Sequence, residues 1–140
     1  MRFMIIRKAD ANTEGDDVAT QELAAAMMAY HEEMGAALKI LGGDGLQPSR
    51  KGARVQFADG KPKVIDGPFA ETKELIAGYT VVEAKSLAEV VEWARRWPPI
   101  DGQGAVQLEI RQLYEIEDFG EAFTPKLKEQ ADRIFQNQKG

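Results

Sequence analysis

Apolar residues along the chain form short runs whose spacing predicts both strands and helices. The first run predicts a strand over 2–7 that is apolar at positions 3–6, on both of its faces. A second strand of this kind is predicted over 77–83, where aromatic and β-branched residues follow one another. A strand with two apolar faces must be covered on both. We therefore expect these strands to lie centrally in a sheet with a layer on each side.

Two further segments carry apolar side chains at the three- and four-residue spacing of a half-buried helix. The first extends over 18–41, and the glycine pair at 42–43 is expected to end it, because glycine readily adopts the left-handed conformation that closes a helix. The second begins at Ser86, which stands three residues before Glu89 in capping-box spacing, and the proline pair at 98–99 stops it.

A third helix is predicted from Pro125 to Gln136, with Thr124 as its N-cap and proline at the first helical position. Its apolar residues follow helical spacing, so we expect this helix to dock rather than project into solvent, for example across a dimer. The residues expected to dock are Phe123, Leu127, Ala131 and Ile134.

The remaining strands are predicted from alternation and turn residues. A short edge strand is expected over 46–50, and a hairpin over 53–57 and 61–65 with a tight Asp59-Gly60 turn. A last strand over 106–111 alternates between apolar and polar residues, so it has one apolar face.

This order of elements predicts an α+β ferredoxin-like sandwich with an inserted β-hairpin and a C-terminal helix. Helices cover only one face of such a sheet, and a second copy of the chain is the simplest cover for the other, since a bare apolar sheet is too large a patch for a soluble monomer. We expect that face to present Met4, Ile6, Thr80 and Val82, with Phe3, Ile5, Tyr79 and Val81 as the alternative set.

Composition narrows the possible classes of protein. The chain has 140 residues, the size of one domain, and contains no cysteine, which excludes disulfide scaffolds and cysteine nucleophiles. It has no apolar segment of signal-peptide or membrane-span length, so we expect a cytoplasmic location and no membrane partner. The net charge of −5 without a basic stripe argues against nucleic-acid binding. There is no phosphate-loop or dinucleotide fingerprint, and we expect no cofactor.

His31 is the single histidine and therefore the first candidate for proton transfer. It lies at the margin of the apolar side of the first helix, where the alternative is a partly exposed helix residue beside Glu32 and Glu33. No metal site is expected, because one histidine without ligand spacing does not make one. The glycine-rich 42–45 segment is interpreted as a helix stop and turn, with Asp44 as a candidate ligand contact.

The segment 66–74, between the hairpin and a central strand, is unusually specific in composition. Proline fixes the backbone, Gly67 permits an unusual turn and Phe69 can anchor the loop, so we expect a rigid loop that presents polar groups. Asp66 is either a catalytic base or a staple that accepts bonds from the amides of residues 67, 69 and 70. Candidate ligand contacts in this loop are Phe69, Glu71 and Lys73.

The segment DGPFAETKE, with GGDGLQPS before it and ELIAGYTVVEAKSLAEVVEWA after it, resembles the DGPF group of YCII-like proteins. The resemblance covers Met1 to Glu115, and the tail resembles an extension found in the same group. It implies a YCII-like domain at 1–116 and a helical extension at 117–140. It also implies a dimeric α/β-barrel, in which two sheets face each other and each subunit has a cleft.

The same resemblance bears on function. YCII-like proteins are thought to use a His-Asp pair, but Met28 and Trp97 stand near the corresponding positions here, so the pair is not carried over. Some relatives act on chlorinated hydroxyquinols, and DGPF members accompany sigma factors. We therefore expect a homodimer that binds a small polar or aromatic molecule beside the DGPF loop, with lyase- or isomerase-type acid–base chemistry. The alternatives are a non-catalytic module associated with transcriptional regulation and a dimer whose DGPF loop is only structural.

Overall fold

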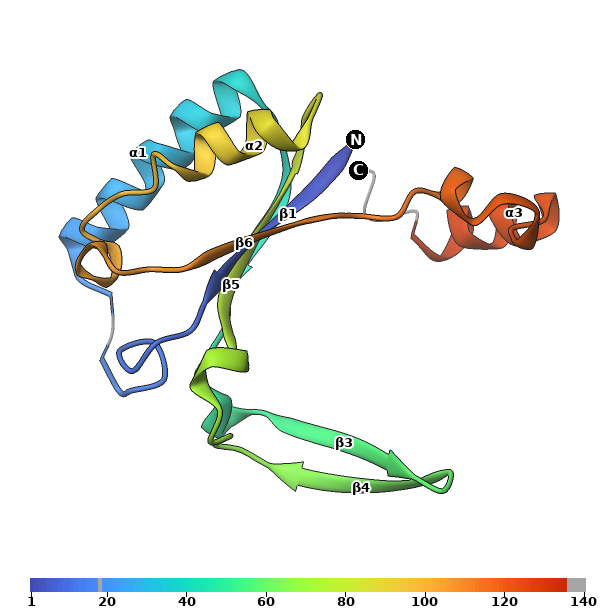
Figure 1. The fold of residues 1–140 in the computed structure, drawn as a ribbon, viewed down its shortest axis with the longest axis horizontal. Helices are drawn as coiled ribbons and strands as arrows, with labels where there is room; N and C mark the ends of the chain where they lie inside the picture. Colours follow the sequence, from blue (N-terminus) through green and yellow to red (C-terminus); the bar gives the residue numbers. More distant parts are fainter. Residues whose placement is uncertain (18, 136–140) are drawn as a thin grey trace.

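The computed structural model describes residues 1–17 and 19–135, which form a helix-covered sheet with two projecting arms (Figure 1). The strands are β1 (Arg2–Lys8), β2 (Lys39–Gly45), β3 (Ala53–Ala58), β4 (Lys61–Asp66), β5 (Ile76–Glu83) and β6 (Leu108–Gln112). The α-helices are α1 (Gln21–Ala37), α2 (Leu87–Ala94) and α3 (Pro125–Ile134). Four short 3-10 helices are η1 (Ser49–Lys51), η2 (Thr72–Glu74), η3 (Asp101–Gly104) and η4 (Ile116–Ala122).

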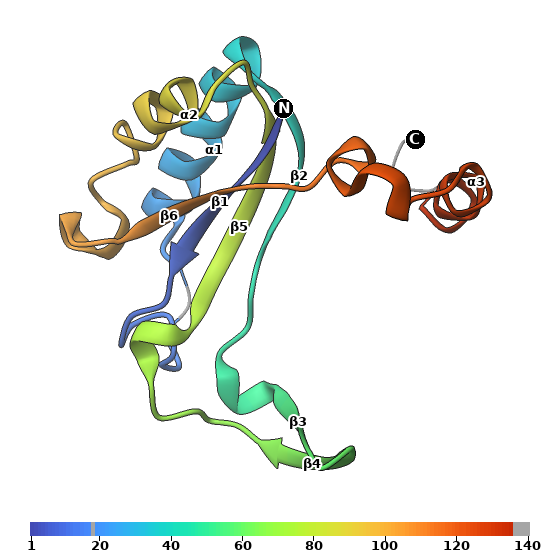
Figure 2. The same ribbon diagram turned by 45° about the vertical axis from the view of Figure 1, so that its right-hand side comes forward.

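The main sheet has the strand order β2-β5-β1-β6, and every neighbouring pair is antiparallel. Helices α1 and α2 lie together on one face of it (Figure 2). Strands β3 and β4 pair only with each other and form the separate hairpin. This is the ferredoxin-like α+β arrangement with an inserted hairpin and a C-terminal helix, as predicted.

The core lies between the helices and the sheet. Phe3 and Val82, which face each other in the β1–β5 register, are both buried, and so is Met34 of α1. Val90 of α2 is also fully buried in this core. Each such side chain stabilises the fold by roughly 1.5–3 kcal/mol through its removal from water. Ile40 of β2 and Ile110 of β6 pack against this core from its edges.

The assignment of residues to the open face of the sheet was correct for β1 and wrong for β5. Met4 lies opposite Val81 and Ile6 lies opposite Tyr79, and directly paired residues share a face. The open face therefore presents Met4, Ile6, Tyr79 and Val81. Thr80 and Val82 point toward the helices and are buried, so their predicted place on the open face is corrected.

The first helix is shorter than predicted, and the edge strand lies elsewhere. α1 ends at Ala37, Leu38 is already extended, and the 42–43 glycines lie within β2, where they pair with β5. The predicted edge strand over 46–50 is wrong, because Pro48 precedes the 3-10 turn η1. Pairing with a central strand outweighed the local helix-stop signal, as expected for a context-dependent element. The predicted start of this helix, Val18, lies outside the described residues.

The predicted first residues of the second and third helices are confirmed by the N-cap hydrogen bonds. The Ser86 hydroxyl accepts the Glu89 amide at 3.2 Å, and the Thr124 hydroxyl accepts the Leu127 amide at 3.2 Å. These bonds satisfy amides that have no partner within the helix. The predicted end of the last helix, Gln136, lies outside the described residues, as do the last five positions of the predicted 117–140 extension.

The C-terminal helix does not dock on its own chain. It projects away from the sheet (Figure 1), and the side chains of Leu127 and Ile134 remain 42% and 62% exposed. Docking across a dimer stays a prediction.

Candidate functional site

A buried ion pair stands at one end of the helix–sheet layer. Arg7 follows Phe3 and Ile5 at two-residue spacing on the helix-facing side of β1, and it is only 8% exposed. Its Nε and Nη2 atoms donate to the two carboxylate oxygens of Asp101 at 3.1 and 2.8 Å. Its Nη1 donates to Asp10 at 2.9 Å. Two-point geometry of this kind fixes the orientation of both partners.

The indole of Trp97 completes this network by donating to Asp101 at 2.8 Å. Burial works to raise the pKa of Asp101, but the bonds from Arg7 and Trp97 outweigh it and hold that pKa below its ordinary value. In Asp10, burial is likewise outweighed by the Thr13 amide and Arg7, so its pKa is lowered too. Both carboxylates are therefore ionised partners of Arg7 at neutral pH.

His31 lies between α1 and the sheet, with each ring nitrogen engaged. Nδ1 is 2.8 Å from the carbonyl oxygen of Met27, which only accepts, so Nδ1 carries the proton. In the neutral imidazole, Nε2 then accepts a hydrogen bond from the Thr80 hydroxyl, which lies 3.3 Å away. That distance is long for a hydrogen bond between these groups. The Nε2 lone pair is thus directed toward the sheet, where its hydrogen bond with Thr80 is weak.

Aromatic rings link His31 to the buried ion pair. The ring centroid of Trp97 lies 6.1 Å from that of His31, and Tyr30 stands 5.4 Å from it, both edge to face. The Tyr30 hydroxyl donates to the carbonyl of Trp93, and burial raises the pKa of this tyrosine to about 12. Tyr30 therefore keeps its proton. The arrangement places an imidazole base, an aromatic wall and a fixed guanidinium–carboxylate pair next to one another.

The DGPF loop is fastened to the rest of the chain by Ser49. Its hydroxyl accepts the Phe69 amide at 3.1 Å and donates to Glu14, while its own amide donates to the same carboxylate at 2.8 Å. The Arg54 guanidinium lies 4.0 Å from the centroid of the Phe69 ring. Gly67 is required here, since a Cβ would stand 1.7 Å from the Ser49 carbonyl oxygen. The predicted anchored loop is present in this form.

Asp66 is exposed at the end of β4, opposite Ala53. The amides expected to hold it donate elsewhere, that of Gly67 to Gly52 and that of Phe69 to Ser49. The staple role predicted for Asp66 is therefore wrong in this structure.

The other predicted site residues are spread over the chain. Asp44 accepts the Tyr79 hydroxyl at 3.3 Å on the open face of the sheet, and Glu71 and Lys73 are exposed around η2. Within residues 1–17 and 19–135, no hydrogen bond or ion pair joins any two of the six candidates. These six are Asp44, Asp66, Phe69, Glu71, Lys73 and His31.

The layer with its inserted hairpin matches a known family model. The YCII-related domain spans residues 1–116 of the chain. The chain belongs to the YCII-related family. An uncharacterized protein from Rhizobium meliloti (strain 1021) is 31% identical over 84 residues, which are 59% of this chain. That match spans only 63% of the relative's own length.

A solved structure also resembles this YCII-related chain. It is the 5-chloro-2-hydroxyhydroquinone dehydrochlorinase from Burkholderia phenoliruptrix AC1100, in complex with 2,5-dihydroxybenzoquinone. The two share 20% sequence identity with a TM-score of 0.47, and the match covers 82% of this chain and 95% of that one.

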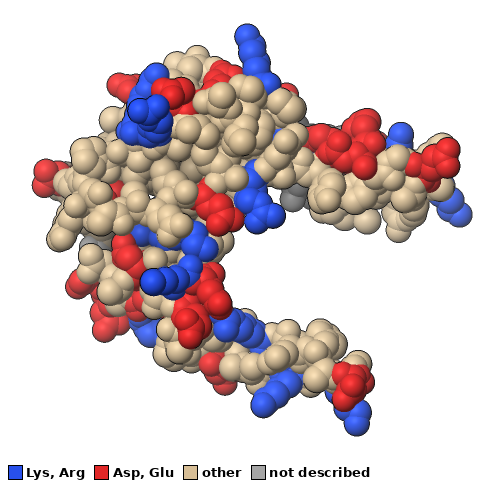
Figure 3. Space-filling view, in the orientation of Figure 1, with Lys and Arg blue, Asp and Glu red and all other residues tan. Residues whose placement is uncertain are grey.

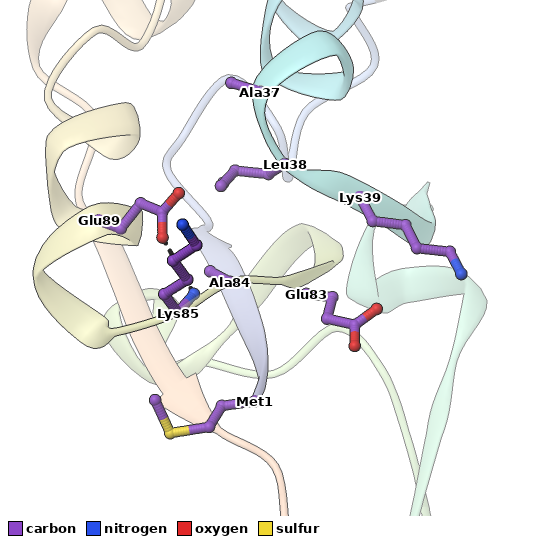
Figure 4. A pocket seen from close by; sticks show the side chains of 8 residues that line it. All are labelled: Met1, Ala37, Leu38, Lys39, Glu83, Ala84, Lys85 and Glu89. Atoms are coloured by element: carbon purple, nitrogen blue, oxygen red, sulfur yellow. Dashed lines mark hydrogen bonds between the residues drawn. The ribbon is translucent and has the colours of Figure 1, made fainter.

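A shallow pocket of about 370 Å³ lies at the opposite end of the layer in this YCII-related protein (Figure 4). Charged side chains of both signs line it, and the Lys85 amide donates to Glu89 at 3.0 Å. Among the described residues, no group of three or more side chains could hold a metal, and no helix is long and apolar enough to cross a membrane.

The sequence reasoning did not find Arg7, Thr80 and Asp101. A signal for Arg7 was present, because it continues the alternation of Phe3 and Ile5 and so falls on the buried face. Its partner Asp101 stands 94 residues away, and no local pattern connects the two. The contact of Thr80 with His31 likewise depends on the packing of a helix over a sheet.

Proposed function

We propose that this YCII-related protein binds a small hydroxylated aromatic or acidic molecule at His31, and that the imidazole removes a proton from it. The observation that carries this proposal is the 2.8 Å contact between His31 Nδ1 and the Met27 carbonyl oxygen. The Nδ1–H is held by the Met27 carbonyl, so Nε2 has a lone pair available for a hydroxyl group. A ligand hydroxyl in the place of the Thr80 hydroxyl would have the geometry that general base catalysis requires.

The surroundings of His31 favour an aromatic ligand. The rings of Tyr30 and Trp97 lie nearly perpendicular to the imidazole, and an aromatic ring gains stability in edge-to-face or offset contacts of this kind. The Arg7–Asp101 pair holds Trp97 in place through its indole nitrogen. The proposed site is therefore the layer between helices and sheet and not the DGPF loop, whose Asp66, Glu71 and Lys73 are exposed.

The test uses the fact that the chain has a single histidine. A panel of hydroxylated aromatics and small carboxylic acids is titrated into the protein while the imidazole nitrogen resonances are followed by NMR. We expect at least one compound to shift the Nε2 resonance in a saturable manner. His31→Gln should abolish binding of that compound, whereas Glu33→Gln, an exposed change on the same helix, should leave it unchanged.

Failure would take either of two forms. If no compound of the panel moves the imidazole resonances, the His31 site is wrong. If a compound binds equally well to the wild-type protein and to His31→Gln, it binds elsewhere. The NMR spectra of His31→Gln and Glu33→Gln should both be those of a folded protein. A loss of binding in His31→Gln then does not result from unfolding.

The open face of the main sheet supports a homodimer as the functional unit. It presents Met4, Ile6, Tyr79 and Val81, and none of the described helices covers it. A second copy would cover these side chains in the face-to-face arrangement of a dimeric α/β-barrel.

The second candidate function is that of a non-catalytic module that associates with another protein, such as a transcription factor. Exposed apolar side chains on the projecting arms favour it, because such patches mark interaction surfaces. This function would be favoured over the first if no compound shifted the His31 resonances and the arms bound a regulatory protein.

A further inference from the structure

The helix-facing side of the main sheet carries three glycines next to Thr80. Gly43 of β2 lies opposite Thr80 of β5, and Gly45 lies opposite Gly78 in the same pair of strands. Directly paired residues share a face, and so do residues two apart along a strand, which places all three glycines on the side of Thr80. Gly43, Gly45 and Gly78 are called the glycine patch below. The patch adjoins the hydroxyl group toward which Nε2 of His31 is directed.

Helix α1 covers this end of the sheet less completely than the other end. Leu23 and Met27 precede His31 by eight and four residues, so they share its side of the helix. Both are only half-buried, whereas Met34, farther along the helix, is fully buried. The two β2 glycines of the patch are exposed, and β2 is an edge strand of the main sheet. Solvent therefore reaches the layer between α1 and β2 at this end.

Two of the three glycines are required by the close approach of β2 and β5. A Cβ at Gly43 would stand 2.7 Å from the Tyr79 carbonyl oxygen. A Cβ at Gly78 would stand 3.1 Å from the carbonyl oxygen of Asp44. The bare backbone at these two positions is therefore a consequence of the strand pairing itself.

The strand pairing does not require a glycine at position 45. Nothing lies within 4 Å of a Cβ built on Gly45, and its φ is outside the left-handed region. The ladder continues past it, because the Leu46 amide donates to the Ala77 carbonyl at 2.8 Å. Glycine weakens a strand, and one without a packing reason is typical of a site where a ligand approaches the backbone closely. Gly45 is therefore the position at which the patch is open to a ligand.

The two arms leave the α1 side of β2 open. The hairpin arm, residues 53–66, and the tail arm, residues 115–134, project on the side of the sheet away from α1 (Figure 2). Figure 3 shows a hollow between the two arms. A molecule that approaches the glycine patch from the α1 side of β2 therefore meets neither arm over these residues.

We infer that the ligand of His31 enters across β2 and lies flat on the glycine patch, so that Gly45 determines which ring systems fit. This inference rests on the proposed function of His31. The patch and Thr80 form the four corners of an area about 4.8 Å across the strands and about 6.6 Å along them, which is the size of one six-membered ring. Bare backbone admits a planar ring at contact distance, whereas a saturated ring is thicker. The ligand class is therefore a planar, single-ring aromatic with a hydroxyl group at the Thr80 corner, facing Nε2.

The single histidine permits a test that needs no ligand. Diethyl pyrocarbonate acylates an imidazole nitrogen with a free lone pair, and Nδ1 is bonded to Met27, so the reaction rate reports access to Nε2. Gly45→Leu extends a side chain over the patch and should slow the reaction severalfold. The matched control is Gly42→Leu, which should react at the wild-type rate. A Cβ at Gly42 also has nothing within 4 Å, but Gly42 lies opposite Val81 and therefore on the open face.

Two results of this reaction would overturn the route across β2. The first is a Gly45→Leu variant that reacts as fast as the wild-type protein, and the second is a wild-type His31 that does not react. Chemical denaturation shows whether both leucine variants are folded. If Gly45→Leu is not, Gly45→Ala takes its place and should slow the reaction to a smaller extent, and an unchanged rate would again overturn the route.

The planar ligand class is tested with two acids that differ only in their ring. 4-Hydroxybenzoate should shift the His31 resonances of the wild-type protein in a saturable manner. trans-4-Hydroxycyclohexanecarboxylate, which has the same polar groups on a saturated ring, should bind about tenfold more weakly or less. Equal affinity of the two acids, or no response to either, would contradict the planar class.

The same resonances separate a failure of this inference from a failure of the proposed function. A compound that binds equally well to the wild-type protein and to Gly45→Leu, but not to His31→Gln, would overturn the placement on the glycine patch and leave the function of His31 intact. No response of the wild-type protein to any compound of the panel would instead overturn the proposed function, and this inference with it.

Discussion

The helix–sheet layer and the two arms differ in how far their apolar side chains are buried. In the layer, alternate residues of β1 and β5 are buried under two helices, and even charged groups such as Arg7 have fixed partners. In the arms, whole strands are exposed, and large apolar side chains such as Phe57 and Ile134 face solvent. The helix-facing side of the layer is packed within one chain. The arms acquire their packing only from another surface, so sensitivity to mutation and to concentration should differ between the two regions.

The largest effect is expected from breaking the ion pair in the layer. Arg7→Met should lower the free energy of unfolding by about 3–5 kcal/mol, because it leaves the buried Asp101 carboxylate without its partner. Chemical denaturation measures this change. The control is Arg95→Met, since Arg95 forms an exposed pair with Glu92 and its loss should cost less than about 1 kcal/mol. Equal effects of the two changes would contradict the buried role of Arg7.

The same pair predicts a dependence of stability on pH. Since the folded-state pKa of Asp101 is lowered, its contribution is fully present above the ordinary aspartate pKa and is lost as the pH falls through the folded value. Asp101→Asn should cost about 2–3 kcal/mol at neutral pH. It should also flatten the loss of stability below about pH 4. A variant with the same acid profile as the wild-type protein would show that Asp101 is not the linked group.

The DGPF loop joins the layer to the hairpin arm, and Gly67→Ala tests that joint. A Cβ at this position meets the Ser49 carbonyl oxygen, so the change should cost about 1–3 kcal/mol and weaken hydrogen-exchange protection near Ser49. Gly45→Ala is the matched control, because nothing lies within 4 Å of a Cβ there. If both alanine variants are equally stable, the loop is less tightly fastened than its geometry indicates.

The smallest effect is expected at Asp66. Its side chain is exposed, and the amides around it bond to Gly52 and Ser49. Asp66→Asn should therefore change the free energy of unfolding by no more than about 0.5 kcal/mol. Thermal and chemical denaturation together would detect a larger loss, which would restore the staple role that this structure argues against.

The sequence predicted what local patterns determine. The spacing of apolar residues located the central strands, Ser86 and Thr124 located two helix starts, and Asp59-Gly60 located the hairpin turn. Each of these signals acts within a few residues. The face of the central strands was predictable only in part, because it depends on which residue of β1 stands opposite which residue of β5.

The candidate site was less predictable for the same reason. His31 was found because it is a rare residue type with known chemistry, but the groups around it come from distant elements. Thr80 lies 49 residues from His31, and Asp101 lies 94 residues from Arg7. The composition of the DGPF loop predicted a rigid segment. Its conformation is fixed by Ser49 and Glu14 rather than by Asp66.

The contrast between a packed layer and incomplete arms depends on the presence of a second copy. Static light scattering coupled to size-exclusion chromatography measures this directly at micromolar protein concentration. We predict a mass of twice that of the chain, and a shift toward the mass of a single chain when residues after Tyr114 are removed. A full-length protein that elutes with the mass of one chain across that concentration range would contradict the account.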